Sequence, residues 1–199
     1  SEERYQALQS LLKTARLDHI AMPVDDKDLY AEFFQTLGFE KGYDPNPRDI
    51  GDEDTSMNTS VLGGMFALMT GIEYTGKVAS QISRYLQKSG NFSIQHIAIR
   101  VDNLQAVVDA WHTLGIRFLT EEDSKPVLLR DTDSPHADVL QCFTYPLCPT
   151  ARGLFFELKQ VFPKGTFVTQ SKDEFRDRNV GMLWHYVRKA LDEGWLFEV

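Results

Sequence analysis

Short apolar runs alternate along the chain with longer stretches in which apolar residues recur every three or four positions. Runs of this kind are typical of strands, and the recurring spacing is typical of amphipathic helices. The pattern therefore predicts a chain built from both kinds of element. The order in which they follow one another is itself repeated.

Part of the sequence occurs twice. Residues 17–25 (LDHIAMPVD) resemble residues 94–102 (IQHIAIRVD), and the Thr-Leu-Gly of 36–38 meets the Thr-Leu-Gly of 113–115 at the same offset of 77 residues. Chance rarely produces three short matches at one constant offset. We therefore expect two copies of one structural unit.

Each copy predicts the element order βαβββ. An apolar run around a histidine gives the first strand, and a helical pattern follows at 28–37 or 104–114. Gly38 and Gly115 then stand where the end of a helix favours a residue that tolerates positive φ. The remaining strands are expected at 39–43, 56–62 and 65–70 in the first copy and at 117–120, 127–130, 139–145 and 154–160 in the second, where 127–130 has the weakest pattern.

These elements predict a single α+β domain over residues 1–199 made of two tandem βαβββ modules. Module one covers about 16–72, a linking helix lies within 76–90, and module two covers about 93–161. A polar amphipathic helical pattern precedes them at 1–15. A longer helical pattern follows at about 171–193, and its apolar face is formed by Phe175, Val180, Leu183, Trp184, Val187 and Leu191. Residues 44–55 are rich in Pro, Asp and Gly and predict a loop.

Composition limits the classes of molecule that the protein is expected to bind and the compartment in which it is expected to occur. The formal net charge is -8, which argues against nucleic acid and anionic membranes, since both require clustered Lys and Arg. No apolar stretch approaches the roughly 18 residues needed to cross a bilayer, and the N-terminal stretch lacks the apolar core of a signal peptide. Cys142 and Cys148 are expected to be free thiols in a reducing, cytoplasmic compartment.

Three residues are candidates for chemistry. His19 and His96 occupy equivalent positions on the first strands of the two modules, so pseudo-two-fold packing would bring them together. Glu157 is a carboxylate inside an apolar strand, and burying it unpaired would be costly. When the last strands of the two copies are aligned without a gap, 64–69 with 153–158, its counterpart is Leu68. A carboxylate kept in one copy only predicts one metal site rather than two.

Two histidines and one carboxylate with open positions form the ligand set of non-haem iron(II) oxygenases, and zinc hydrolases use the same ligands. The alternative is that both histidines are ordinary half-buried residues and that Glu157 pairs with a Lys or Arg. The remaining histidines, His112, His136 and His185, lie on a helix, in a loop and on the C-terminal helix and are weaker candidates.

The residues described so far resemble the vicinal-oxygen-chelate superfamily, and most closely the catalytic C-terminal half of 4-hydroxyphenylpyruvate dioxygenase and hydroxymandelate synthase. The matching motifs are Ser-Gln-Ile at 80–82, Ile-Gln-His-Ile-Ala at 94–98, Leu-Gln-Cys-Phe-Thr-Tyr-Pro at 140–146, and Phe-Phe-Glu at 155–157. The resemblance covers about residues 16–190. It departs from the family at 71–76 and 175–181.

The resemblance implies an open, cupped mixed β-barrel around one Fe(2+) held by His19, His96 and Glu157. It implies a 2-oxo acid substrate that chelates the metal and reacts with O2 by oxidative decarboxylation. Gln81, Gln95 and Gln141 match family positions that line the pocket, where an amide can hydrogen-bond a substrate oxygen. The departures leave the identity of the substrate open, and nothing in the sequence fixes the oligomeric state.

Three other functions share parts of this pattern. An extradiol ring-cleaving dioxygenase would use the same ligands and require Tyr145 or His185 as an acid–base residue. A glyoxalase-type isomerase or lyase would use nickel or zinc, and the absence of a fourth ligand at Leu68 argues against it. A ligand-sequestering module of the bleomycin-resistance kind would need no metal ligands. Iron rather than zinc or manganese rests on the resemblance alone.

Overall fold

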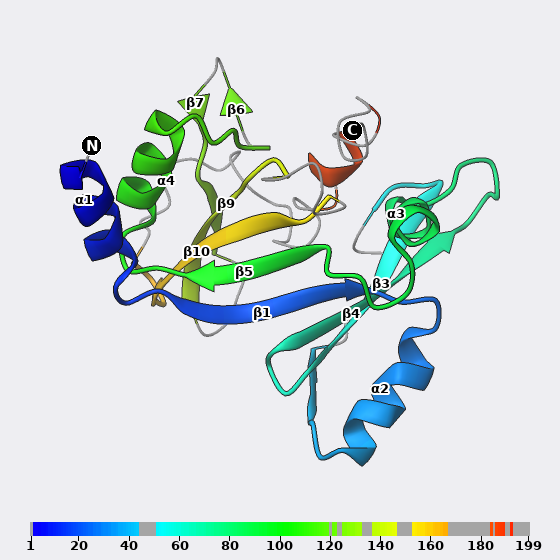
Figure 1. Cartoon of the computed structure of the whole chain (residues 1–199). Helices are drawn as coiled ribbons and strands as arrows, with labels where there is room; N and C mark the ends of the chain where they lie inside the picture. Colours follow the sequence, from blue (N-terminus) through cyan, green and yellow to red (C-terminus); the bar gives the residue numbers. More distant parts are fainter. Residues whose placement is uncertain are drawn as a thin grey trace.

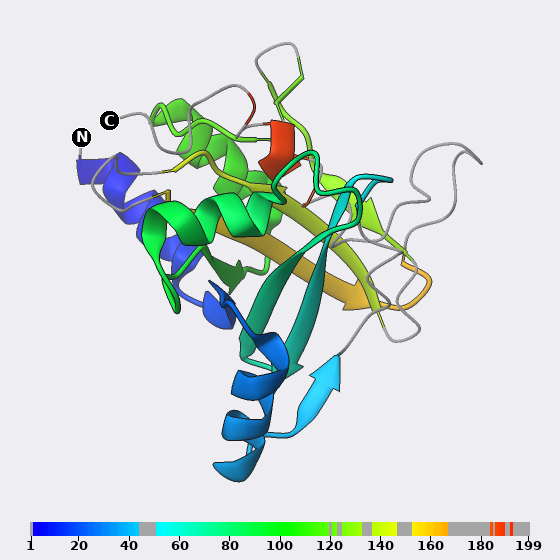
Figure 2. The same ribbon diagram turned by 90° about the vertical axis from the view of Figure 1, so that its right-hand side faces the viewer.

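A computed structural model of the chain describes residues 2–43, 51–119, 121–122, 125–132, 137–146, 153–166, 184, 186–189 and 192. Eight strands in this part form one mixed sheet that curls into a half-barrel (Figures 1 and 2), and two more form a separate hairpin. The helices are α1 (Glu2–Leu12), α2 (Lys27–Thr36), α3 (Gln81–Ser89) and α4 (Leu104–Thr113). The strands are β1 (Arg16–Pro23), β2 (Lys41–Tyr43), β3 (Thr55–Leu62), β4 (Phe66–Glu73), β5 (His96–Arg100), β6 (Glu121–Glu122), β7 (Lys125–Pro126), β8 (Leu129–Asp131), β9 (Ala137–Phe143) and β10 (Phe155–Pro163).

The sheet repeats the symmetry of the sequence. Its strand order is β2-β3-β4-β1-β5-β10-β9-β8, so each module contributes four neighbouring strands. The modules meet where β1 and β5 run antiparallel along the middle of Figure 1, and each of these strands has a parallel neighbour, β4 or β10, on its outer side. The expected architecture of two modules in an open, cupped mixed barrel is confirmed.

Local sequence accounts for the ends of the helices. Asp26, Ser80 and Asn103 each accept a hydrogen bond from a backbone N–H in the first turn of the helix they precede, which satisfies a donor that the helix itself cannot. After α2 and α4 the chain turns at Gly38 and Gly115, with φ of 94° and 87°. The predicted positive φ at both glycines is confirmed.

The two faces of the sheet bury different clusters. On the convex face, α2 packs on Leu62 and Leu68, while α4 packs on Cys142 and Leu158. The concave face carries one apolar cluster over each module. The cluster over module one consists of Ala21, Met57, Ala67, Met69, Ile82 and Trp184, and that over module two consists of Leu119, Leu129, Phe143, Phe155 and Val187. The inside of the cup is therefore walled by apolar side chains.

The C-terminal helix contributes to both concave clusters. Of the predicted range 171–193, only Trp184, 186–189 and Asp192 belong to the described residues, and they are helical. Trp184 and Val187 are buried, as the predicted apolar face requires. Arg188 lies over the Trp184 ring, 5.2 Å from its centroid, and forms an ion pair with Asp52. This segment therefore packs against the concave clusters of both modules.

Some boundaries differ from the sequence predictions. Residues 117–119 form a single bridge, between Phe118 and Thr144, instead of a strand. The weak pattern at 127–130 corresponds to an actual strand, β8, which takes the place in module two that β2 takes in module one. The linking helix begins only at Gln81, because Ser80 caps it. Residues 44–50 of the predicted loop lie outside the described residues. None of the described helices is both long and apolar enough to span a bilayer.

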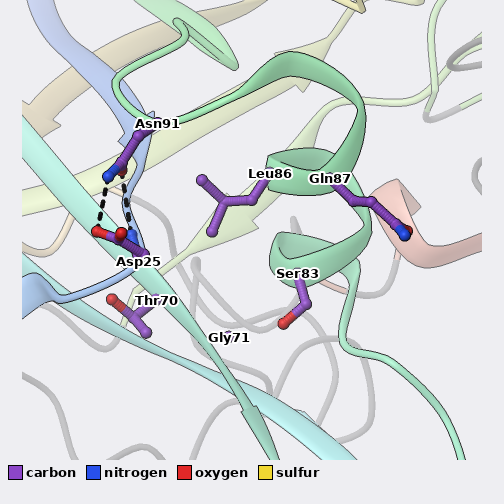
Figure 3. Close-up of a pocket in the computed structure, with 7 residues that line it drawn as sticks. All are labelled: Asp25, Thr70, Gly71, Ser83, Leu86, Gln87 and Asn91. Atoms are coloured by element: carbon purple, nitrogen blue, oxygen red, sulfur yellow. Dashed lines mark hydrogen bonds between the residues drawn. The ribbon is translucent and has the colours of Figure 1, made fainter.

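A hollow of about 500 Å³ lies between β4 and α3 (Figure 3). A reciprocal pair of hydrogen bonds runs beside it: Asp25 N–H donates to Asn91 Oδ1 over 3.1 Å, and Asn91 Nδ2 donates to Asp25 Oδ1 over 2.6 Å. The predicted metal ligands do not line this hollow, and neither do the three predicted substrate-binding glutamines, Gln81, Gln95 and Gln141. The candidate chemistry lies elsewhere in the cup.

Gly71 allows α3 to pack closely on β4. A Cβ at Gly71 would lie 1.9 Å from Ser80 Oγ and 2.7 Å from Ser83 Oγ, where Ser80 caps the helix. Gly71→Ala should therefore lower the free energy of unfolding by about 1–3 kcal/mol, through overpacking and a disturbed cap. Urea unfolding measures the change. The control Gly42→Ala, whose Cβ would meet only Val61 O at 3.8 Å, should stay within about 0.5 kcal/mol of the parent. Equal stability of the two variants would contradict the packing argument.

Candidate metal centre

The register of β1 and β5 brings the two predicted histidines together. Ala21 pairs with His96 and His19 pairs with Ala98, so each histidine faces an alanine and lies diagonally across from the other histidine. The two alanines are fully buried and leave room for the rings. The Nε2 atoms of His19 and His96 are 3.3 Å apart, and the ring planes meet at 79°. The convergence expected from pseudo-two-fold packing is present.

Glu157 is the third side chain at this point. Strand β10 runs parallel to β5, and Glu157 pairs with Ala98, which puts its carboxylate on the same face as both histidines. Its Oε2 atom lies 3.6 Å from Nε2 of His19 and 3.6 Å from Nε2 of His96. In the part of the chain that the structure describes, these three residues are the one group of His, Cys, Asp or Glu that could hold a metal.

The spacing of the three donor atoms suits one shared ion. Donors bound at about 2.1 Å to one ion stand about 3.0 Å apart at octahedral angles and about 3.4 Å apart at tetrahedral angles. The observed separations of 3.3 and 3.6 Å are close to both values and close to bonding range before any ion draws them in. All three donors come from the sheet, so the side facing the cup stays open to a ligand.

His96 is the most buried of the three candidate ligands. Its side chain is 2% exposed and stacks on Phe155, with ring centroids 5.1 Å apart. Burial, followed by the nearby charges of His19 and Lys159, holds the pKa of His96 well below its ordinary value. The imidazole is therefore neutral at neutral pH, which is the form that binds a metal. Nδ1 donates to Gln95 Oε1 over 3.1 Å, and this leaves the lone pair of Nε2 facing the other ligands.

His19 is the most exposed of the three candidate ligands, with 20% of its side chain accessible. Its Nδ1 lies 3.0 Å from a carboxylate oxygen of Asp18, which can only accept, so the proton sits on Nδ1 and Nε2 again points to the shared site. Sequence reasoning missed Asp18, because strict strand alternation puts it on the opposite face. The register breaks between Leu17 and His19, and this irregularity could not be foreseen from the sequence.

One sequence alignment needs correction. Leu68 was expected to stand in module one where Glu157 stands in module two. The structure pairs Ala21 with Ala67, just as it pairs Ala98 with Glu157, so Ala67 is the true counterpart. Leu68 points to the convex face and packs in the cluster under α2. The ungapped alignment was wrong by one residue, and in a strand one residue exchanges the faces. Neither residue can ligate a metal, so the site still has one carboxylate.

The three predicted glutamines are all buried, in different circumstances. Gln141 pairs with Lys159 in the sheet and so lies on the face of Glu157, and neither its amide oxygen nor its amide nitrogen has a hydrogen-bond partner. Oε1 of Gln81 is also unpartnered. Oε1 of Gln95, by contrast, is engaged by His96. An unsatisfied buried amide costs about 1–3 kcal/mol, so Gln81 and Gln141 are suited to a polar ligand.

Two further buried groups lack partners and were not predicted. Thr59 Oγ1 and Trp184 Nε1 have none. Thr59 pairs with Met69 and therefore shares the concave face of module one, where Trp184 also packs. The apolar periodicity of 171–193 predicted a buried Trp184, but only the structure reveals that its N–H is unsatisfied. Unpartnered polar groups thus occur over both halves of the cup.

The remaining candidates are not brought to this site. His112 is exposed on α4, on the convex side of module two. Cys142 is buried and is not part of a disulfide, in agreement with the prediction. His136, His185 and Cys148 lie outside the described residues.

Comparison with solved structures gives the fold. A variant of 4-hydroxymandelate synthase from Streptomyces coelicolor matches with a TM-score of 0.68 and 20% identity over 89% of this chain and 54% of its own. A xylose isomerase-like TIM barrel/4-hydroxyphenylpyruvate dioxygenase fusion protein matches with a TM-score of 0.53 and 18% identity over 88% of this chain and 29% of its own. No protein-family model and no curated protein sequence matches the chain.

These likenesses confirm the resemblance seen in the sequence. The chain has a vicinal-oxygen-chelate fold and resembles the C-terminal half of 4-hydroxyphenylpyruvate dioxygenase. It spans about half the length of the synthase and under a third of the fusion protein. At this level of identity the comparisons describe the fold, and the chemistry has to be argued from the site.

Removing a ligand should abolish tight metal binding. We expect His96→Ala and Glu157→Ala to weaken Zn(II) or Co(II) binding by more than the roughly 10–100-fold typical of losing an outer partner. Isothermal titration of the metal-free protein measures it. His112→Ala removes an exposed histidine and serves as the matched control. Unchanged affinity in both ligand variants would show that metal binds elsewhere or not at all.

Proposed function

We propose that the protein is a non-haem iron(II) dioxygenase that acts on a 2-oxo acid with O2 and oxidative decarboxylation. The observation that carries the proposal is the convergence of His19, His96 and Glu157 on one face of the cup. The candidate ligand set has one carboxylate and two imidazoles, which is the set used by iron(II) oxygenases. A bound iron(II) would supply the point at which the oxo acid and O2 meet.

Charge supports an anionic ligand. One carboxylate against a divalent ion leaves a net charge of about +1 at the centre, which favours a substrate carboxylate. With three donors from the protein, a bound iron(II) would have coordination sites left for a bidentate oxo acid and for O2. The chain's role is to hold its donors on one side and keep the other side free.

The walls of the cup support a substrate with an apolar body. Phe143 and Phe155 are buried on the concave side of module two, and Met57, Met69 and Trp184 are buried on that of module one. Such walls exclude water and reward burial of a hydrophobic group. Gln81 and Gln141 would supply hydrogen bonds to the polar oxygens of the same ligand, which would satisfy amides that have no partner in the protein.

The direct experiment is anaerobic titration of the protein with iron(II), followed by O2 uptake against a panel of 2-oxo acids that includes 4-hydroxyphenylpyruvate. We expect a visible charge-transfer absorption when the oxo acid is added, then O2 consumption with release of CO2. Glu157→Ala should lose both responses. Iron binding without any response to oxo acids would refute the proposal and favour extradiol or isomerase chemistry, which catechols and thiol adducts would then test.

Gln141 gives a prediction in which stability and ligand binding move in opposite directions. Gln141→Leu removes an unsatisfied buried amide, so the ligand-free protein should be as stable as the parent or more stable, while KM for the oxo acid should rise roughly tenfold, about the worth of one lost hydrogen bond. Thermal unfolding and steady-state O2 uptake measure the two effects.

The control is Gln160→Leu. Gln160 accepts from the backbone N–H of Leu104 over 2.9 Å and donates to Asp102 O, so it ties α4 to β10. This variant should lose stability and keep its KM. If Gln141→Leu behaves like Gln160→Leu, then Gln141 serves the fold and not the ligand.

A further inference from the structure

The three candidate ligands are held in place by different means. The side chains of His96 and Glu157 are 2% and 5% exposed, so close packing restricts them. His19 is 20% exposed, and the one aromatic ring described against it is that of His96. A partly exposed imidazole on a strand can turn about χ1 and χ2 unless something else fixes it. The neighbouring polar contacts supply that restraint.

A β-bulge directs Asp18 toward His19. Leu17 pairs with Ile99 and His19 pairs with the adjacent Ala98, so Asp18 is an extra residue on β1. In a bulge the extra residue leaves the regular alternation and its side chain is re-aimed. The Asp18 carboxylate thereby reaches Nδ1 of His19, 3.0 Å away, on the concave side. The bulge interrupts the central strand pair directly beside His19. Without it, Asp18 would lie on the opposite face of the sheet.

Two cations fix the carboxylate in turn. Lys159 Nζ donates to Asp18 Oδ2 over 3.1 Å, and Arg100 Nε donates to Oδ1 over 3.0 Å with a second contact from Nη2. Arg100 and Lys159 pair with each other in the register of β5 and β10, two residues beyond Ala98 and Glu157. The cluster therefore spans the same three strands as the ligand set.

The carboxylate is enclosed by its partners. It is only 10% exposed, and the side chains of His19, Arg100 and Lys159 all contact it. Hydrogen bonds that involve charged groups are also stronger and better directed than neutral ones.

We propose that Asp18, clamped by Arg100 and Lys159, is the positioning residue that orients His19 for metal binding. The inference rests on the proposed metal centre. Asp18 accepts the Nδ1 proton of His19, which fixes the tautomer and turns Nε2 toward the ion. The cations act through Asp18 and touch neither the ion nor the substrate. His19, the least buried of the three, is thus held by hydrogen bonds and ion pairs, whereas His96 and Glu157 are held by packing.

The test is titration of the metal-free protein with Co(II) and with Zn(II). Asp18→Ala should lower the affinity for either metal by 10–100-fold, the usual cost of losing such a partner. Asp18→Asn keeps an acceptor oxygen but loses the charge that holds the cations. Its metal affinity should fall between those of the parent and of Asp18→Ala. Arg16→Met removes an exposed cation two residues away on β1 and should change nothing. The visible spectrum of the Co(II) form should also change in Asp18→Ala, because one donor is misoriented.

Two further measurements separate positioning from folding. Thermal unfolding of the metal-free variants shows whether each one folds, since Asp18→Ala leaves Arg100 and Lys159 without their shared carboxylate. If Asp18→Ala does not fold, the combined variant Asp18→Leu, Arg100→Leu, Lys159→Met decides, because it removes all three charges and leaves none unpaired. Its metal affinity should also be at least tenfold lower. Affinity within twofold of the parent, in a folded variant, would overturn the clamp. If the parent itself binds no metal, the proposed centre fails instead, so the two failures are distinguishable.

Discussion

The candidate centre depends on the register between β1 and β5. Pairing His19 with Ala98 and Ala21 with His96 puts two imidazoles on one face, diagonally across the line where the modules meet. A slip by one residue would send one histidine to the convex face and end the convergence. The small alanines matter as well, since a larger side chain opposite either histidine would occupy the space into which the rings turn. The parallel pairing of β10 with β5 then adds Glu157 at the same level.

Duplication explains the symmetry of the scaffold, and single substitutions explain the asymmetry of the site. Both modules supply a histidine from the same position, while only module two supplies a carboxylate, since Ala67 stands at the equivalent place in module one. The outer partners differ too. The Gln95 amide hydrogen-bonds the buried His96, and the Asp18 carboxylate hydrogen-bonds the partly exposed His19. The concave walls are apolar over both modules, with unpartnered amides between them.

Much of this could be predicted from the sequence because the repeat carries long-range information. The repeat at a constant offset of 77 residues predicted two modules, a helix in each that ends at a glycine, and the convergence of His19 with His96. Local pattern failed where pairing decides the outcome. The strand expected at 117–120 is a single bridge, while the weak run at 127–130 forms β8 beside β9. The Leu68 alignment was wrong by one residue, and Asp18 was hidden by a bulge, because neither register nor bulges can be derived from periodicity alone. The roles of the glutamines and the identity of the metal remain predictions that follow from the resemblance.

Anomalous diffraction from crystals grown with iron(II) or zinc(II) would test the central claim most directly, because it locates the ion without reference to activity. The account predicts one peak on the concave face, within about 2.0–2.3 Å of Nε2 of His19, Nε2 of His96 and a carboxylate oxygen of Glu157. A peak at another cluster, or one bonded to a single histidine with Glu157 turned away, would contradict it.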